Sequence, residues 1–491
     1  MDRNDIVEEP PPQAEAAYKP AKARRKQAVE QAKTAAKRSV RTSAWGTHRR
    51  SSADGTRLPR VFVLPDAAGY QPGTSLQTRG PRFSSYLFGV HCFSQDTGAP
   101  MIPVIFDAIN KRYRTNSTAD ADLFFGFVPL PVWPPPANAS IDPQFMRPFC
   151  ARMQQTVLRL AKVVGVRSST LDNLPRRILL EDLSRLKNAF VLTPVIPGMQ
   201  AGKGLVDETC RSFGFGRAIE LTLTFNADQP QHTKRPAADS VRVHKAPIPF
   251  MSNIRWSTEL VRNPPWQLDA TRARPVLMSF VGSVGDPGTP RYAVRSAMMR
   301  GCTAAGPHVC EMIDFESGSG CQGIPEHLEE DDVRSFRCIR RVFALKARSV
   351  FCLEPPGNSP GRKSIIDSIL SGCVPVLLQD EHMSTHFDSY LPWHFGWRRN
   401  ASIVYSAHKL ISSSLRFETI VADLVRSNAT GAVFALQQTI SERGHNLVYG
   451  IDGHYRDDDA VGLMLRGLVE WQRGLAGGHM TDRYLKVHLE L

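Results

Sequence analysis

The chain has 491 residues, of which 42% are hydrophobic, and its formal net charge is +14. This length and apolar fraction exclude a disordered protein and predict two to three globular units. The charge does not indicate a nucleic-acid-binding protein, because the first 60 residues hold 14 basic and 7 acidic side chains. Half of the excess therefore belongs to one N-terminal segment.

That segment is a basic tail over residues 1–57, with too few large apolar side chains to fold alone. Its densest charges are Arg24-Arg25-Lys26 and Lys37-Arg38. We expect a solvated linker or a partly helical arm, and electrostatic contact with an anionic membrane or polymer is the alternative. No run is apolar enough to span a bilayer, and no signal peptide follows Met1.

Residues 58–250 form the first predicted globular unit. Short apolar runs predict three buried strands, and a longer segment with apolar residues at helical spacing predicts helices. Strands that alternate with helices indicate a parallel sheet covered on both faces, and thus an α/β fold. The polar, Gly- and Pro-rich stretch 197–245 predicts no element. The strands are at 60–65, 121–130 and 188–192, and the helices lie within 146–187.

Residues 251–480 form the second predicted unit, which repeats the alternation. It ends in two further helical segments that we expect to pack on the outside of the domain. The predicted strands are at 275–282, 309–315, 350–353 and 374–378, the helices between them at 292–300, 326–346 and 362–370, and the closing helices at 410–443 and 459–475.

The strongest functional signal lies between residues 349 and 378. A predicted strand ends in a Pro- and Gly-rich loop, and the next helix opens with Arg362 and Lys363. Such a junction directs backbone N–H groups and positive charge beyond the carboxyl end of the strand. An anion fits there, in the place where open α/β sheets bind ligands.

The helix at 362–370 is amphipathic. Four apolar residues form one stripe, while polar residues lie elsewhere on its circumference, and Gly372 supplies the helix stop. The guanidinium of Arg362 is therefore expected to be free to reach the ligand. The stripe consists of Ile365, Ile366, Ile369 and Leu370, and the polar residues are Arg362, Ser364, Asp367 and Ser368.

Residues 349–376 resemble the signature of the exostosin-like glycosyltransferase family. They match the pattern S-x-F-C-L-x-P-x-G, then a helix bearing an arginine, then G-C-x-P-V. Two shorter segments resemble the same family. They are Arg112-Tyr113-Arg114-Thr115 followed by Ala119 to Phe125, and Phe280-Val281-Gly282 followed by Arg295. The resemblance covers roughly residues 60 to 475.

The resemblance implies a GT-B architecture, in which two Rossmann-like domains face each other across a cleft and the C-terminal domain holds a UDP-sugar. It implies an inverting transferase that needs no metal and no cofactor beyond the donor, acts on a polysaccharide or glycan acceptor and resides in the Golgi. The positions carried over for nucleotide-sugar binding are Arg295, Gly357, Arg362, Ser364, Asp380 and Glu381.

Three features depart from the family. Pro356 stands where a basic residue is usual, residues 197–203 lack the common G-x-D-H stretch, and no membrane anchor is visible. Inversion also needs a base that deprotonates the acceptor hydroxyl. The sequence does not choose among His91, Asp107, Asp207 and Glu208.

Other motifs carry weaker signals. Gly318 to Gly323 is a formal G-x-G-x-x-G, which we interpret as a flexible loop because it falls late in its domain. Asp120-x-Asp122 and Asp457 to Asp459 have the form of D-x-D metal motifs, but the first precedes its strand and the second begins a helix. We therefore expect no metal site.

Nine cysteines without C-x-x-C spacing exclude a zinc motif. In a lumenal protein, one or two disulfides among Cys302, Cys310, Cys321 and Cys338 are expected, and the odd total leaves at least one thiol free. The chain also holds four N-glycosylation sequons, at Asn116, Asn138, Asn400 and Asn428.

Three rival functions stay open at this point. An NAD(P)-dependent oxidoreductase would need its glycine motif in the first βα unit of a domain. A catalytically inactive family member would bind a nucleotide sugar or glycan and act as the partner of a second transferase. A nucleic-acid binder would need aromatic residues interleaved with its basic ones or a recognisable binding module, and neither is found.

Overall fold

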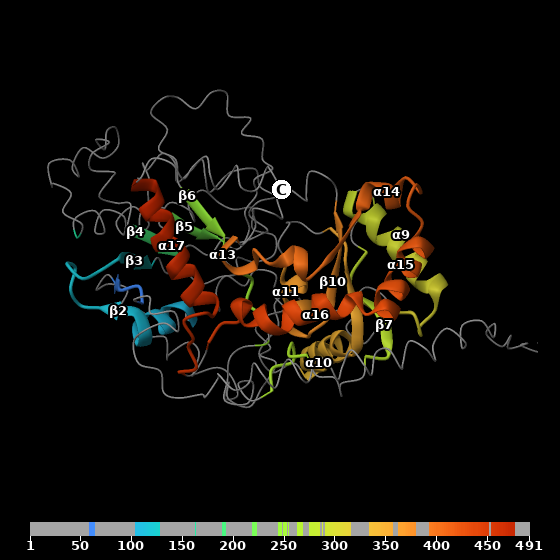
Figure 1. The fold of residues 1–491 in the computed structure, drawn as a ribbon, viewed down its shortest axis with the longest axis horizontal. Helices are drawn as coiled ribbons and strands as arrows, with labels where there is room; N and C mark the ends of the chain where they lie inside the picture. Colours follow the sequence, from blue (N-terminus) through green and yellow to red (C-terminus); the bar gives the residue numbers. More distant parts are fainter. Residues whose placement is uncertain are drawn as a thin grey trace, which may run out of the picture.

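The computed structural model describes the chain in segments. These are residues 58–63, 104–127, 163, 189–192, 219–222, 244–247, 249–252, 254, 263–268, 274–284, 287, 290–315, 333–356, 362–379, 392–450 and 453–476. Within them the chain forms two separate sheets, and every strand pair in both is parallel. Figure 1 shows helices beside both sheets. The predicted α/β class is confirmed, whereas the basic tail and most of the predicted helices at 146–187 lie outside the described residues.

The first sheet has six strands in the order β2-β1-β3-β4-β5-β6. β1, β3 and β4 lie at the predicted places, but β5 lies and β6 begins in the stretch 197–245, where no element was predicted. Each of these two strands is four residues long, too short for a periodic signal to stand out from its Gly- and Pro-rich surroundings. The strands are Val61–Val63 (β1), Arg114–Thr115 (β2), Leu123–Phe127 (β3), Ala189–Leu192 (β4), Ile219–Thr222 (β5) and His244–Pro247 (β6), and the π-helix η4 at Ile109–Tyr113 precedes β2.

The second sheet has five strands in the order β11-β10-β9-β7-β8. β9 and β10 are buried along their whole length because they are central strands covered on both faces. The strands are Val276–Gly282 (β7), Cys310–Asp314 (β8), Ser349–Glu354 (β9), Val374–Gln379 (β10) and Ile403–Ser406 (β11), and the helices between them are Pro290–Ala305 (α9), Val333–Arg348 (α10), Lys363–Leu370 (α11), Pro392–Phe395 (α13) and Arg398–Asn400 (η7).

The predicted closing segment at 410–443 is three helices rather than one. Gly431 adopts a left-handed φ of 79° and ends one helix before the next begins. The helices are Ala407–Ile411 (α14), Phe417–Thr430 (α15) and Ala432–Arg443 (α16), followed by Gly444–Leu447 (η8) and Ala460–Ala476 (α17).

The prediction that the last helix packs on the outside of the second unit is wrong. α17 crosses to the first sheet, where its buried face shares one hydrophobic core with β1, β3 and the helical turn before η4. In Figure 1, α17 lies beside the blue and green strands of that sheet. The buried α17 residues are Ala460, Val461, Met464, Leu465 and Leu468.

Gly467 permits this crossing helix to meet α13. A Cβ atom at Gly467 would overlap the indole ring of Trp393. We expect Gly467→Ala to lower the melting temperature, although a glycine-to-alanine change in an unobstructed helix stabilises by about 1 kcal/mol. Differential scanning calorimetry of this variant checks the expectation, with Glu470→Ala on the exposed face of α17 as control. A stabilised Gly467→Ala protein would contradict this packing.

Candidate functional site

The strand order of the second sheet reverses between β7 and β9. In open α/β sheets, ligands bind beyond the carboxyl ends of the strands at such a reversal. Arg295 of α9 spans this point, because its Nη1 donates to the Ser283 carbonyl after β7 at 2.7 Å and its Nε donates to the Pro356 carbonyl after β9 at 3.2 Å. The structure thus places Arg295 where it ties together the two loops that flank the switch point.

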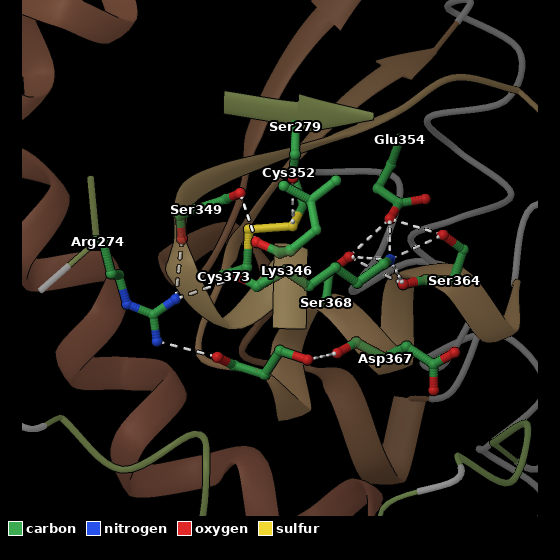
Figure 2. The surroundings of a disulfide bond; sticks show 12 residues. Arg274, Ser279, Lys346, Ser349, Cys352, Glu354, Ser364, Asp367, Ser368 and Cys373 are labelled. Atoms are coloured by element: carbon green, nitrogen blue, oxygen red, sulfur yellow. Dashed lines mark hydrogen bonds and ion pairs between the residues drawn. A yellow bond between two sulfur atoms is a disulfide. The ribbon is translucent and has the colours of Figure 1, made fainter. Parts of the chain in front are cut away.

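At the carboxyl end of β9, the side chain of Glu354 is 2% exposed. Its Oε1 accepts hydrogen bonds from Lys346 Nζ at 3.2 Å, Ser364 Oγ at 2.9 Å and Ser368 Oγ at 2.7 Å. Lys346 Nζ also donates to the Ser368 hydroxyl at 2.7 Å. Figure 2 shows these side chains of β9, α10 and α11 converging on one point. We call Glu354, Lys346, Ser364, Ser368 and Arg362 the Glu354 cluster.

Arg362 is the fifth member of the cluster and the N-cap of α11. Its Nη2 donates to Glu354 Oε2 at 3.0 Å, and its side chain is 17% exposed. Glu354 thus holds one edge of the guanidinium, a contact that the sequence did not predict, and the role of Arg362 in binding a ligand stays a prediction. Burial lowers the pKa of Arg362 and the Glu354 charge opposes that shift.

The cluster carries more positive than negative charge, because Lys346 and Arg362 face the single carboxylate of Glu354. Burial raises the pKa of Glu354, but Lys346, Arg362 and the two serine hydroxyls outweigh it and hold that pKa below its ordinary value. Glu354 is thus ionised, and one positive charge remains in excess beside the N-terminus of α11. This arrangement attracts an anion.

The polar residues Asp367 and Ser368 of α11 are buried together with its apolar stripe. All six residues from Ile365 to Leu370 are buried. Ser368 belongs to the Glu354 cluster. Asp367 instead binds Lys363 Nζ at 2.6 Å and accepts a hydrogen bond from Ser252 Oγ at 2.6 Å. The helix is therefore fixed on both its apolar and its polar sides.

Arg274 and Gly372 fix the turn that follows α11. Gly372 takes a left-handed φ of 70°, as its predicted role of helix stop requires, and a Cβ there would collide with the guanidinium of Arg274. Arg274 fills that space and donates to the carbonyls of Ser349 and Ser371, each at 2.9 Å. It thereby ties the start of β9 to the end of α11.

A disulfide between Cys352 and Cys373 joins β9 to the turn before β10, with the two Cα atoms 5.8 Å apart (Figure 2). It closes the segment that contains Arg362 and the whole of α11. The predicted set of disulfide cysteines did not include this pair, but it did include Cys302 and Cys310, whose disulfide is confirmed. Cys338 is disulfide-bonded as well.

Several predicted site residues lie outside the described residues. These are Gly357, Asp380 and Glu381 of the nucleotide-sugar set, the glycine motif at 318–323, and His91, Asp207 and Glu208 of the candidate bases. The remaining candidate base, Asp107, binds Lys111 Nζ at 2.9 Å and accepts a hydrogen bond from the Tyr455 hydroxyl.

The first D-x-D motif has a structural role. Asp122 accepts a hydrogen bond from the Arg60 backbone N–H at 2.8 Å, and Asp120 pairs with the Arg60 guanidinium at 3.2 Å. Both carboxylates thus fix the start of β1 beside β3. Within the described segments, no three His, Cys, Asp or Glu side chains gather as metal ligands would.

The second acidic motif connects the segment before α17 to the first unit and to η8. Asp457 accepts a hydrogen bond from Arg112 Nε at 2.7 Å, and Asp458 pairs with His445 Nε2 at 3.0 Å. Asp459 accepts hydrogen bonds from the Val461 and Gly462 N–H groups and so caps α17, as predicted. Arg456 also donates to two of the three, from its guanidinium to Asp458 and from its backbone N–H to Asp459. Each of the three adjacent acids therefore has partners within the protein.

Sequence reasoning missed Lys346 and Glu354 as members of the site. Lys346 was predicted only as the end of a helix, and Glu354 only as a variable position within the motif. A signal was present, because a glutamate that closes a fully apolar strand needs a buried cation as its partner. The sequence does not say which cation that is.

The part of the chain that holds this site is similar to known proteins. Residues 211–399 match the family model of the Exostosin GT47 domain. The chain is 24% identical over 207 residues to the probable xyloglucan galactosyltransferase GT19 of Arabidopsis thaliana. The aligned region covers 40% of this chain and 42% of that protein. It is 35% identical over 121 residues to the probable xyloglucan galactosyltransferase GT17 of the same plant, or 24% of this chain and 22% of that protein.

A third relative in Arabidopsis thaliana is the xyloglucan-specific galacturonosyltransferase 1, with 34% identity over 121 residues, which is 25% of this chain and 15% of that protein. The aligned part of this chain thus spans less than half of each of these three relatives.

The cap of α17 gives the protein a pH dependence. Burial raises the pKa of Asp459 from 3.8 to about 7, so the folded state favours its neutral form. The stability that this preference contributes is complete below pH 3.8 and is lost as the pH rises toward about 7. In the wild type, the free energy of unfolding should therefore fall by up to about 1.4 kcal/mol per pH unit within that window, and we expect Asp459→Asn to remove this decline.

Urea unfolding of both proteins at several pH values between 4 and 7 measures this decline. An Asp459→Asn protein whose stability falls with pH as steeply as that of the wild type would contradict the assignment.

Proposed function

We propose that this chain, which carries an exostosin-like GT47 domain at residues 211–399, is a glycosyltransferase that moves a sugar from a UDP-sugar to a polysaccharide or glycan acceptor. One observation carries the proposal. The Glu354 cluster leaves a positive charge in excess at a helix N-terminus, next to the switch point of a parallel sheet. A nucleotide diphosphate is the anion that such a junction suits.

In the proposed reaction, Arg362 binds the donor diphosphate through the N–H groups that Glu354 leaves available. The negative charge on the diphosphate grows as the glycosidic bond breaks, and a fixed guanidinium stabilises that charge more in the transition state than in the ground state. Arg295 fixes the two loops on either side. The acceptor hydroxyl attacks the opposite face of the sugar carbon and inverts it, while a base, still unassigned, takes the proton.

For the acceptor, we propose a plant-type cell-wall glycan of the xyloglucan class. Three of the relatives are named for galactosyl or galacturonosyl transfer to xyloglucan. UDP-galactose and UDP-galacturonic acid with xyloglucan oligosaccharides are therefore the first donors and acceptor to test.

We also propose that the two sheets belong to two Rossmann-like domains in a GT-B arrangement, with the boundary near residue 250. The two separate parallel sheets and the return of α17 to the first of them support this arrangement.

The proposed location is the Golgi lumen. The disulfides Cys302–Cys310 and Cys352–Cys373 support it, because such bonds persist in oxidising compartments. Among the described helices, none has the length and apolar character that crossing a bilayer requires.

Arg362→Ala tests whether Arg362 stabilises the leaving diphosphate. We expect a loss of about 3 kcal/mol of transition-state stabilisation, or at least about a hundredfold in rate. The fold should persist because Glu354 keeps its three donors on Oε1. Arg362→Lys should restore activity only in part, since an ammonium group lacks the planar fork. Transfer is measured by UDP release, and circular dichroism serves as the control for folding.

Wild-type turnover by a folded Arg362→Ala protein would contradict the proposal. Absence of transfer by the wild-type protein, together with binding of a nucleotide sugar, would favour instead an inactive binding partner of a second transferase.

The proposal also includes independence from metal ions. If Arg362 and a helix N-terminus neutralise the diphosphate, transfer should continue at an unchanged rate in excess EDTA. Loss of activity that manganese restores would indicate catalysis by a metal ion instead.

A further inference from the structure

On the basis of the proposed function, we propose that Glu354 is a positioning residue that orients Arg362 for the nucleotide diphosphate, and that Lys346 holds Glu354 in place. Glu354 does not itself touch the ligand in this proposal. It acts through the guanidinium that it binds.

The two oxygens of Glu354 have different partners. Oε1 accepts hydrogen bonds from Lys346, Ser364 and Ser368, at distances of 2.7 to 3.2 Å. Oε2 accepts one from Arg362 Nη2 at 3.0 Å. One oxygen therefore anchors the carboxylate to α10 and α11, and the other directs the arginine.

Holding the arginine through only one carboxylate oxygen favours ligand binding by Arg362. An unrestrained arginine side chain loses about 2 kcal/mol of rotamer entropy when a ligand fixes it. Glu354 lowers that loss, because it engages only one of the five N–H groups of Arg362 and holds the planar fork in one orientation. Preorganisation of this kind strengthens binding without adding a contact.

Glu354 also has an opposing effect, because its negative charge repels a diphosphate. Lys346, with its Nζ 3.2 Å from the carboxylate and its side chain 3% exposed, offsets that charge. With Lys346 present the cluster attracts anions, so the orientation of Arg362 is the effect that decides the affinity. Without Lys346, the uncompensated Glu354 carboxylate would compete with the phosphate for Arg362.

The same helix provides a matched control. Asp367 is also a buried carboxylate, with a side chain 7% exposed, and it also pairs with a lysine. Its partners are Lys363 and Ser252 rather than Arg362. Glu354→Gln and Asp367→Asn each neutralise one buried acid of similar surroundings, but only the first reaches Arg362.

The test is a double-mutant cycle on UDP affinity, measured by isothermal titration calorimetry. We expect Glu354→Gln to weaken UDP binding about tenfold when Arg362 is present. In the Arg362→Ala background, the same change should have less than about a twofold effect, because the residue through which Glu354 acts is gone. Asp367→Asn should leave the affinity within about twofold of the wild type.

Two results would overturn the inference. Equal weakening by Glu354→Gln in both backgrounds would show a general structural role, and tighter binding would show that Glu354 competes with the phosphate. If Glu354→Gln does not fold, the pair Lys346→Met with Glu354→Gln removes both buried charges, a change that proteins often tolerate. The same tenfold loss and the same dependence on Arg362 are expected of it.

The design separates the inference from the proposed function. Failure of the wild-type protein to bind UDP would contradict the function itself. Wild-type binding of UDP together with an uncoupled cycle would contradict only the role of Glu354.

Discussion

A carboxylate at the end of a buried strand has to be neutralised, and the candidate site is organised around that requirement. The Glu354 side chain is 2% exposed, and burying an isolated charge there would cost a large free energy. Two helices supply its partners: Lys346 comes from α10, Arg362 caps α11, and Ser364 and Ser368 lie in the first turns of α11. The ion pairs therefore fix how the two helices meet the sheet.

The rest of the second unit maintains this arrangement. Arg274 and Gly372 fasten the start of β9 to the end of α11, and the disulfide between Cys352 and Cys373 closes the same segment covalently. Arg295 holds together the loops that flank the strand reversal. A ligand that binds at this edge would thus meet side chains that are already in place, which is the condition for electrostatic preorganisation.

The acidic run at the C-terminal end shows how one pattern supports two interpretations. Three consecutive aspartates have the form of a metal motif, but their neighbours in space decide their role. Asp457 meets Arg112 of the first unit, Asp458 meets His445, and Asp459 caps α17. The first of these contacts connects residues that are 345 positions apart in the sequence. Asp457 to Asp459 therefore connect the first unit to α17.

The sequence by itself determined the α/β class, nearly every strand of the second sheet, the position of α11 and the arginine at its start. These features depend on local periodicity and on turn residues such as Gly372, which act over a few positions. Only the tertiary structure decided that α17 returns to the first sheet, that Cys352 meets Cys373 and that Lys346 neutralises Glu354. The physical reason is that a buried charge or thiol takes its partner from whichever element the topology brings near, and hydrophobic periodicity does not encode that proximity.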